Sequence, residues 1–279
     1  MIFQGRKLLI ATMHGKEKVL APIFEKKLKV HCELAVGFDT DQFGTFSGEI
    51  ERTEDPVQTA RIKCKTASEK FGYDLVLSSE GSFGPHPGLI FIPADEEFLF
   101  LLDTQNQLEI IARNLSTSTN FSSRDIRTVT ELMEFAKAVK FPEHGLILKA
   151  GHDQDKQVIK GIQDENQLLE SFRSMMKRNC MVTVDTDMRA FCNPTRMRVI
   201  LETAELLVRK IESVCPQCGM PGYDVVKVQA GLPCSLCYSK TRSTLSYKYC
   251  CQSCNFREVV NYPHGKTHED PMYCDYCNP

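Results

Sequence analysis

The end of the chain contains four Cys-x-x-Cys pairs: Cys215-Pro216-Gln217-Cys218, Cys234-Ser235-Leu236-Cys237, Cys251-Gln252-Ser253-Cys254 and Cys274-Asp275-Tyr276-Cys277. Nine of the thirteen cysteines of the 279-residue chain fall in this stretch. Two residues between paired cysteines let one turn of backbone present both sulfurs to a single metal ion. Four such pairs within 65 residues predict two tetrahedral four-cysteine zinc sites.

Two other uses of paired cysteines fit this sequence less well. A disulfide framework is typical of exported proteins, and we expect no signal peptide because Met1–Ala11 has one short apolar patch and no cleavage-like site. Redox-active Cys-x-x-Cys motifs occur singly, at the start of a helix that follows a strand. Gly219 follows the first pair, where a tight turn favours a residue that tolerates positive φ. The pattern therefore predicts a small double zinc ribbon whose bound metal supplies the folding energy.

The order of the pairs predicts how they share two ions. Pairs that are adjacent in the sequence would hold one ion each, so the first site is Cys215, Cys218, Cys234 and Cys237, and the second is Cys251, Cys254, Cys274 and Cys277. A crossed arrangement, in which the pairs alternate between the ions, is the alternative. Cys250 is then spare, unless it replaces Cys251. His264 and His268 are expected to be solvated side chains.

The charge of residues 215–279 bears on the partner of the ribbon. The region has six Lys or Arg and five Asp or Glu. Each zinc ion with four thiolates adds about two negative charges, which makes the region acidic. Ligation by four cysteines also leaves no open position on the metal for catalysis. We expect a structural or protein-docking role, and no binding of nucleic acid.

The composition of the whole chain is that of a globular protein. It is 42% hydrophobic and 25% charged, with a formal net charge of -2 at pH 7, which excludes disorder, collagen and coiled coil as overall descriptions. No apolar run approaches the roughly 20 residues that span a bilayer. We expect a cytoplasmic protein without membrane contact. The one clear domain boundary is at Cys215, which predicts domains at 1–214 and 215–279.

Residues 1–214 alternate between strand and helix patterns, which predicts an α/β fold with a mixed sheet flanked by helices. Strands are predicted at 7–11, 30–36, 75–78, 98–102, 107–111, 145–149, 157–162 and 181–184. Helices are predicted at 16–28, 55–71, 126–139, 165–177 and 193–214. The Gly- and Pro-rich stretch 79–88 is predicted to be a loop.

Two strand ends of this domain carry residues suited to a ligand. Thr12, His14 and Lys16 lie in the turn between the first strand and the first helix, where backbone N–H groups and a lysine suit a phosphate. Glu80 follows a buried strand and precedes Gly81 and Ser82, at the place where open α/β sheets bind ligands. A buried carboxylate there has to meet water, a metal or a distant cation. Ordinary structural turns are the alternative for both segments.

A third segment precedes the last long helix. Helix capping explains Asn193, which is followed by a proline at the first helical position. Capping does not explain Arg196, because a cation in the first turn opposes the helix dipole. Arg196 therefore indicates an anionic partner, either Asp187 or the phosphate of a ligand.

The chain resembles an uncharacterised bacterial family of unknown function. The matching stretches are Ala11-Thr12 with 14–17, 37–41, 44–46, 79–87, 185–190 with 193–197, and the cysteine pairs that end in Cys274-Asp275-Tyr276-Cys277-Asn278-Pro279. This resemblance implies a zinc ribbon and brings no known activity.

A more distant resemblance is to the inosine/xanthosine triphosphate pyrophosphatase superfamily. Residues 11–14 with Lys16 or Lys18 are similar to its opening Ala-Thr-Gly-Asn-x-x-Lys turn, and 58–64 to its Glu-Asn-Ala-x-x-Lys-Ala helix. Residues 79–82 resemble its acidic glycine-containing loop, and 193–196 the Ser-His-Arg that opens its last helix. The metal-binding glutamate of that superfamily is Gln58 here, and the nearby acids are Glu49, Glu51, Glu54 and Asp55.

The resemblance implies a pyrophosphatase-like domain that hydrolyses a nucleoside triphosphate or a similar phosphoester with a divalent metal such as Mg²⁺. In this hypothesis Glu80 and Asp187 hold the metal and orient water, while Lys16, Lys63 and Arg196 neutralise the phosphates. The remaining substrate-binding candidates are Thr12, His14, Gly81, Ser82 and Asn193. The alternative is a non-catalytic adaptor that binds a nucleotide or peptide and docks a protein through its ribbons.

Overall fold

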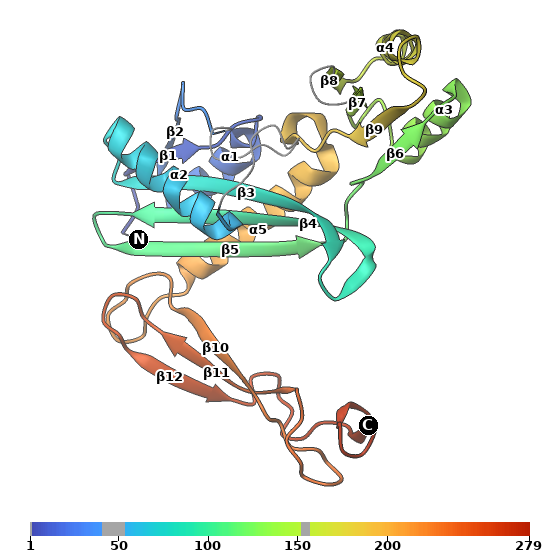
Figure 1. Ribbon diagram of the computed structural model, residues 1–279. Coiled ribbons are helices and arrows are strands. Elements are labelled where there is room, and N and C mark those ends of the chain that lie inside the picture. Colours follow the sequence, from blue (N-terminus) through green and yellow to red (C-terminus); the bar gives the residue numbers. More distant parts are fainter. Residues whose placement is uncertain (1, 41–53, 152–156) are drawn as a thin grey trace. The chain divides into compact units, whose positions relative to one another are not determined.

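The computed structural model describes residues 2–40, 54–151 and 157–279 (Figure 1). The chain divides into two compact units. Unit 1 comprises Met1–Gln105 and Ile111–Val208, and unit 2 comprises Asn106–Ile110 and Arg209–Pro279, with all four cysteine pairs. The acids Glu49 and Glu51 and the stretch 44–46 lie outside the described residues.

Unit 1 contains a mixed five-stranded sheet, called sheet A, with the strand order β2-β1-β3-β4-β5. Its strands are β1 (Lys7–Ala11), β2 (His31–Leu34), β3 (Leu75–His86), β4 (Leu89–Asp103) and β5 (Leu108–Ser116). Strand β1 lies parallel to both β2 and β3, whereas β3 and β4 are antiparallel. The predicted α/β fold with a mixed sheet is thus confirmed.

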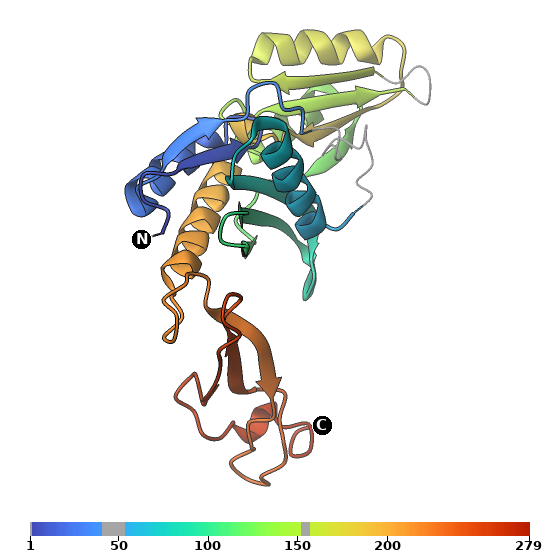
Figure 2. The ribbon, with the colours of Figure 1, turned by 90° about the vertical axis from the view of Figure 1, so that its left-hand side faces the viewer.

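Helices cover both faces of sheet A. Helix α1 (Glu17–Leu28) joins β1 to β2, and α2 (Pro56–Phe71) leads back past β1 to β3. Because these two crossovers run in opposite directions, their right-handedness puts the two helices on opposite faces. Ala60, Cys64 and Ala67 of α2 pack on one face, and α5 (Pro194–Glu212) crosses the other (Figures 1 and 2). The β1/β3 junction is therefore the point at which the strand order reverses, where α/β sheets of this order bind ligands.

A second, antiparallel sheet of unit 1, called sheet B, has the strand order β6-β9-β7-β8. Its strands are β6 (Ser123–Ile126), β7 (Leu146–Ala150), β8 (Gln157–Ile162) and β9 (Val182–Thr186). Helices α3 (Val129–Ala138) and α4 (Glu165–Met176) bury Leu132, Leu168 and Phe172 in the core of this part of the unit.

Unit 2 contains a three-stranded antiparallel sheet with the order β10-β11-β12. The strands are β10 (Asp224–Ala230), β11 (Thr244–Cys250) and β12 (Arg257–Asn261). None of the helices in the described ranges combines the length and the hydropathy of a membrane-spanning segment.

Two element predictions are wrong for identifiable reasons. Residues 79–86 are not a loop but the second half of β3, because they pair with β4 residue by residue, with Glu80 opposite Phe98. The glycines and prolines of this stretch belong to a long hairpin instead. The helix predicted from Ile126 begins only at Val129, because Ile126 ends β6 and Thr128 caps the helix.

Candidate functional site

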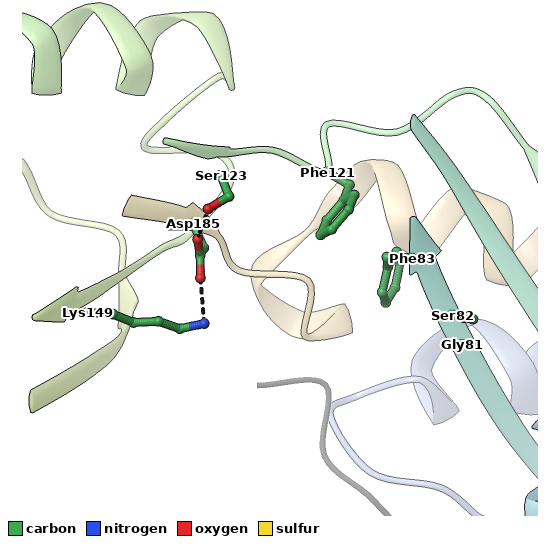
Figure 3. A pocket seen from close by; sticks show the side chains of 7 residues that line it. All are labelled: Gly81, Ser82, Phe83, Phe121, Ser123, Lys149 and Asp185. Carbon is green, nitrogen blue, oxygen red and sulfur yellow. Dashed lines mark hydrogen bonds and ion pairs between the residues drawn. The ribbon is translucent and has the colours of Figure 1, made fainter. Parts of the chain in front are cut away.

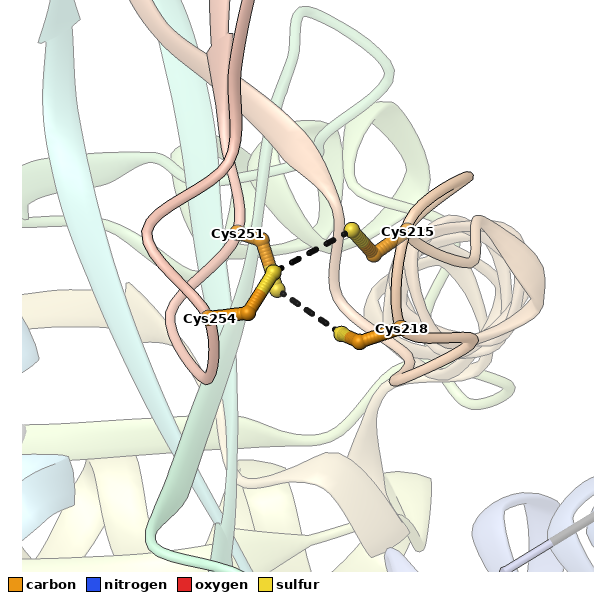
Figure 4. Close-up of side chains that lie close together, drawn as sticks. All are labelled: Cys215, Cys218, Cys251 and Cys254. Atoms are coloured by element: carbon orange, nitrogen blue, oxygen red, sulfur yellow. Dashed lines mark hydrogen bonds between the residues drawn. The ribbon is translucent and has the colours of Figure 1, made fainter.

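The paired cysteines of unit 2 gather into two clusters. One contains Cys215, Cys218, Cys251 and Cys254 (Figure 4), and the other contains Cys234, Cys237, Cys274 and Cys277. Sulfur atoms of facing pairs lie 3.6–3.9 Å apart. That is too far for a disulfide, at about 2.0 Å. Four sulfurs at about 2.3 Å from a tetrahedral zinc ion are roughly 3.8 Å apart. The donor set and its spacing are consistent with two structural zinc ions.

Each cysteine pair lies in the same kind of tight turn. In each pair, the residue after the second cysteine donates its backbone N–H to the carbonyl of the first cysteine, at 2.8–3.1 Å. The four donating residues are Gly219, Tyr238, Asn255 and Asn278. Gly219 has a φ of 74°, as expected for this turn, and Tyr238 and Asn255 adopt a φ of 60° without being glycine. Hydrogen bonds from the Ser239 side chain and backbone lower the pKa of Cys237 to about 6, which favours its thiolate form.

The pairs are crossed between the two clusters, so the prediction of sequential pairing is wrong. Strands β10 and β11 are antiparallel, with Asp224 opposite Cys250 and Ala230 opposite Thr244. The first pair precedes β10 and the third follows β11, which brings them to the same end of the sheet. The second pair and the fourth pair meet at the other end, roughly 20 Å away for a strand of this length.

The residues left over by this pairing have other contacts. The Cys250 thiol faces the Cys251 carbonyl at 3.6 Å, and His264 Nε2 lies 3.0 Å from the Tyr247 hydroxyl. Among the described residues, neither Cys250 nor the histidines belong to a four-cysteine cluster.

The surroundings of the two clusters differ. Cys215 and Cys251 pack with Tyr223, whose ring stacks on Tyr249 with 5.4 Å between centroids. The second cluster instead has exposed large side chains nearby in the sequence, namely Leu236, Tyr238, Met272, Tyr273 and Tyr276. The first cluster thus has an aromatic core of its own, and the second presents apolar and aromatic groups to solvent.

A second candidate site lies at the β1/β3 junction of unit 1, and we call it the charged cluster. It consists of Lys16, Lys63, Glu80, Asp95, Glu97 and Arg196, each at most 6% exposed. The Lys16 ammonium donates to Ser79 Oγ at 2.9 Å. Lys63 of α2 forms an ion pair with Glu80, and Arg196 Nε of α5 donates to Glu97 Oε1 at 2.6 Å. Of the five residues that the hydrolase hypothesis assigns to the metal and the phosphates, all but Asp187 are therefore close together.

The charged cluster extends around both faces of β3. Ser78 donates to the Ala60 carbonyl of α2, and Glu80 pairs with Lys63 of the same helix. Since successive strand residues point to opposite faces, Ser79 and Gly81 face the other side, toward Lys16 and Arg196. The pairing of β3 with β1 ends at Ser78. The charged cluster therefore lies next to the first residues of β3 that have no partner in β1.

Two side chains of the charged cluster have strongly perturbed acidities. Burial, and then the charge of Arg196, lowers the pKa of Lys16 to about 8, although Glu97 and Glu80 oppose this shift. Burial, and then the neighbouring Glu97, raises the pKa of Asp95 to about 8. Several buried titratable groups with perturbed pKa values in one place are typical of a functional site.

Asp95 and Glu97 were not predicted from the sequence. They lie two residues apart on β4, in register with Phe83 and Gly81 of β3. The signal that would have found them is alternation, since the buried Leu99 continues the same face of the strand. The anionic partner expected for Arg196 is Glu97, and not Asp187.

Gly81 leaves room for the Arg196–Glu97 ion pair. A Cβ atom at this position would lie 2.8 Å from Glu97 Oε1 and would collide with the Arg196 guanidinium. The guanidinium also lies over the Phe83 ring, 4.8 Å from its centroid. A glycine is therefore required on β3 for a packing reason.

Asp187 and Asn193 are held by contacts within unit 1. The Asp187 carboxylate accepts from the Gly161 backbone N–H at 3.0 Å and from Arg189 at 2.6 Å, so it does not join the charged cluster. Asn193 Oδ1 accepts from the Arg196 backbone N–H at 3.0 Å, as the capping prediction requires. The buried Asn193 amide also donates to Asn120 at 2.8 Å.

Thr12 and His14 line a different cavity, of about 450 Å³, between the ends of β1 and β2. The His14 ring lies 5.7 Å from that of Phe191. On α2, Gln58 is exposed and accepts from Arg61 at 2.8 Å, while Asp55 caps the helix. None of these four side chains is part of the charged cluster as defined above.

A cavity of about 390 Å³ begins at Gly81 and Ser82 and extends to sheet B (Figure 3). It is lined by Gly81, Ser82, Phe83, Phe121, Ser123, Lys149 and Asp185. The Phe83 and Phe121 rings have centroids 5.9 Å apart. Opposite them, Asp185 binds Lys149 at 2.6 Å and Ser123 at 2.5 Å. Aromatic walls with a few polar groups are typical of small-molecule sites.

Comparison with known proteins identifies the family. The model described as domain of unknown function (DUF6671) matches residues 63–279, and the chain belongs to that family. The matched region includes Lys63, Glu80, Arg196 and all eight clustered cysteines, and it begins after α1. No curated protein matches the chain.

Proposed function

We propose that unit 1 binds a nucleoside triphosphate or a similar phosphoester at the β1/β3 junction and hydrolyses it with a divalent metal ion. The observation that carries this proposal is the convergence of Lys16, Lys63 and Arg196 from three helices around one segment of β3. Open α/β sheets bind their ligands where the strand order reverses, and the β1/β3 junction is that point in sheet A.

The charges of the cluster suit a phosphoryl group. Lys16 stands at the start of α1, where the helix dipole also favours an anion. Cations fixed in a buried site stabilise the charge that develops during phosphoryl transfer without having to reorganise. A bound divalent ion would supply further charge neutralisation of the phosphoryl oxygens. Glu80, held in place by Lys63, is the candidate for orienting the attacking water.

The neighbouring cavity suits the nucleoside. It begins at Gly81, one residue after Glu80, so one ligand could reach both places. Phe83 and Phe121 offer ring faces for stacking, and Lys149 with Asp185 offers hydrogen-bonding groups. The distant resemblance to the inosine/xanthosine triphosphate pyrophosphatases supports the same ligand class, with Gln58 as its main departure.

The test is a hydrolysis screen of nucleoside triphosphates and phosphoesters with Mg²⁺ or Mn²⁺, using the full zinc-loaded chain. Because Glu80→Gln alone would leave the buried Lys63 charge uncompensated, the diagnostic variant is Lys63→Met with Glu80→Gln. We expect this variant to lose activity by at least about 100-fold, whereas Glu96→Gln, on the same sheet, retains it. Activity that survives the double substitution removes the proposed mechanism.

A second candidate function is a non-catalytic adaptor. The exposed Leu236, Tyr238, Met272, Tyr273 and Tyr276 favour it, because exposed aromatic and apolar groups are typical of protein-docking surfaces. Nucleotide binding without hydrolysis of any substrate in the screen would support this function over the enzyme.

A further inference from the structure

Glu80 and Asp187, the two carboxylates expected to bind Mg²⁺, already have cationic partners. Glu80 is paired with Lys63, and Asp187 is held by Arg189 and a backbone N–H. Metal ligation by either one would have to compete with these contacts. The oxygen ligands for a divalent ion are better sought elsewhere in the charged cluster.

Asp95 and Glu97 have carboxylate oxygens that accept no hydrogen bond from a donor group of the protein. Within the described ranges, no donor group of the protein hydrogen-bonds to either carboxylate oxygen of Asp95 or to Oε2 of Glu97, and the two carboxyl groups are close enough to share a proton. Asp95 is 0% exposed and Glu97 is 1% exposed. Buried polar atoms are nearly always satisfied, so three orphaned carboxylate oxygens in one place require a water, a proton or an ion.

The geometry of β4 directs both carboxylates to the same place. Residues two apart on a strand share a face, and Asp95 and Glu97 lie opposite Phe83 and Gly81. Arg196 binds Glu97 only through Oε1, which fixes the carboxylate and leaves Oε2 available.

We infer that Asp95 and Glu97 together bind a divalent cation of the Mg²⁺ or Mn²⁺ class. Mg²⁺ is commonly bound by one or two carboxylates, with waters and substrate phosphates completing its octahedron. An all-oxygen donor set selects these hard cations over the zinc that four thiolates prefer. Arg196 acts as a partner that orients a ligand, a contact whose loss commonly weakens metal sites. The inference supplies the metal ion of the proposed function, yet the site can be tested without any substrate.

The test is a Mn²⁺ titration of the full zinc-loaded chain, followed by electron paramagnetic resonance, in the absence of nucleotide. Wild type should bind one Mn²⁺, and Asp95→Asn should bind it at least about tenfold more weakly. The matched control is Glu96→Gln, because Glu96 lies between the two ligands in sequence and pairs with Arg113 instead. This control should bind Mn²⁺ as wild type does.

Two outcomes overturn the inference: wild type that binds no Mn²⁺ at millimolar concentration, or Asp95→Asn that binds it unchanged. Absence of Mn²⁺ binding by wild type rejects the site whether or not the variant folds. Failure of the hydrolase proposal looks different, because Mn²⁺ would bind at Asp95 while no phosphoester is cleaved. Hydrolysis by a chain whose Asp95→Asn variant binds Mn²⁺ normally would reject the site alone.

Discussion

Among single residues, Lys63 and Glu80 carry a large expected cost in stability, since their ion pair is almost fully buried. Replacing one partner of a buried pair leaves the other charge uncompensated and typically costs about 3–5 kcal/mol. We therefore expect Lys63→Met and Glu80→Gln each to destabilise unit 1 strongly, and the double variant to be more stable than either. Urea unfolding monitored by circular dichroism measures all three. Additive losses would show that the two residues do not act as a pair.

Gly81 provides a second test at the same scale. The Cβ atom of Gly81→Ala would press on Glu97 and Arg196, so we expect a loss of about 1–3 kcal/mol, typical of overpacking. Gly84, on the same strand, has no atom within 4 Å of the corresponding position. Gly84→Ala should therefore change the unfolding free energy by less than about 0.5 kcal/mol. Equal effects of the two substitutions would contradict the packing account.

At the scale of elements, local sequence patterns predict the presence of a helix or strand better than they predict where it begins and ends. The helix at α2 followed from its Asp55-Pro56 start and its apolar spacing, and the structure has it at Pro56–Phe71. Local patterns end strand β3 at Ser78, because the glycines and prolines that follow are turn signals and only the pairing with β4 overrides them. Pairing with a distant strand is a property that no local window contains.

The crossing of the cysteine pairs is likewise set by elements, here by the antiparallel pairing of β10 with β11. If Cys234 and Cys237 are both replaced by serine, the crossed arrangement predicts the loss of one zinc ion and exposure of the Cys274 and Cys277 thiols. Alkylation followed by mass spectrometry reports which thiols react. Reaction at Cys215 and Cys218 instead would contradict the crossed pairing and support the sequential one.

At the scale of the whole molecule, the sequence predicted the cations of the charged cluster but not most of its anions. Lys16, Glu80 and Arg196 each lie near a predicted strand or helix end, whereas Lys63 lies inside α2 and is indicated only by the resemblance of 58–64 to the pyrophosphatase helix. Asp95 and Glu97 lie in an acidic run that is typical of a solvated strand. Their burial results from the sheet and from α5 together, and is therefore a property of the tertiary structure.

The stability of unit 2 should depend on metal, because its sheet has a small apolar core around the first cysteine cluster. Chelation should release two zinc ions per chain and abolish amide protection in β10–β12. Sheet A, with its own core, should keep its protection. Hydrogen exchange measured by mass spectrometry compares the two regions in one experiment. Fewer than one zinc ion per freshly purified, reduced chain would reject the ribbon assignment.

The central claim is that the buried cations of the charged cluster hold phosphate, and calorimetric titration with a non-hydrolysable nucleoside triphosphate analogue and Mg²⁺ tests it most directly. Lys16 has a pKa of about 8 and is surrounded by Arg196, Lys63, Glu97 and Glu80. It is charged below that pH and neutral above it, so affinity should fall as the pH rises through about 8. Lys16→Met should weaken binding at least about tenfold at pH 7 and flatten this pH dependence. No binding by wild type, or equal affinity in Lys16→Met at every pH, would contradict the account.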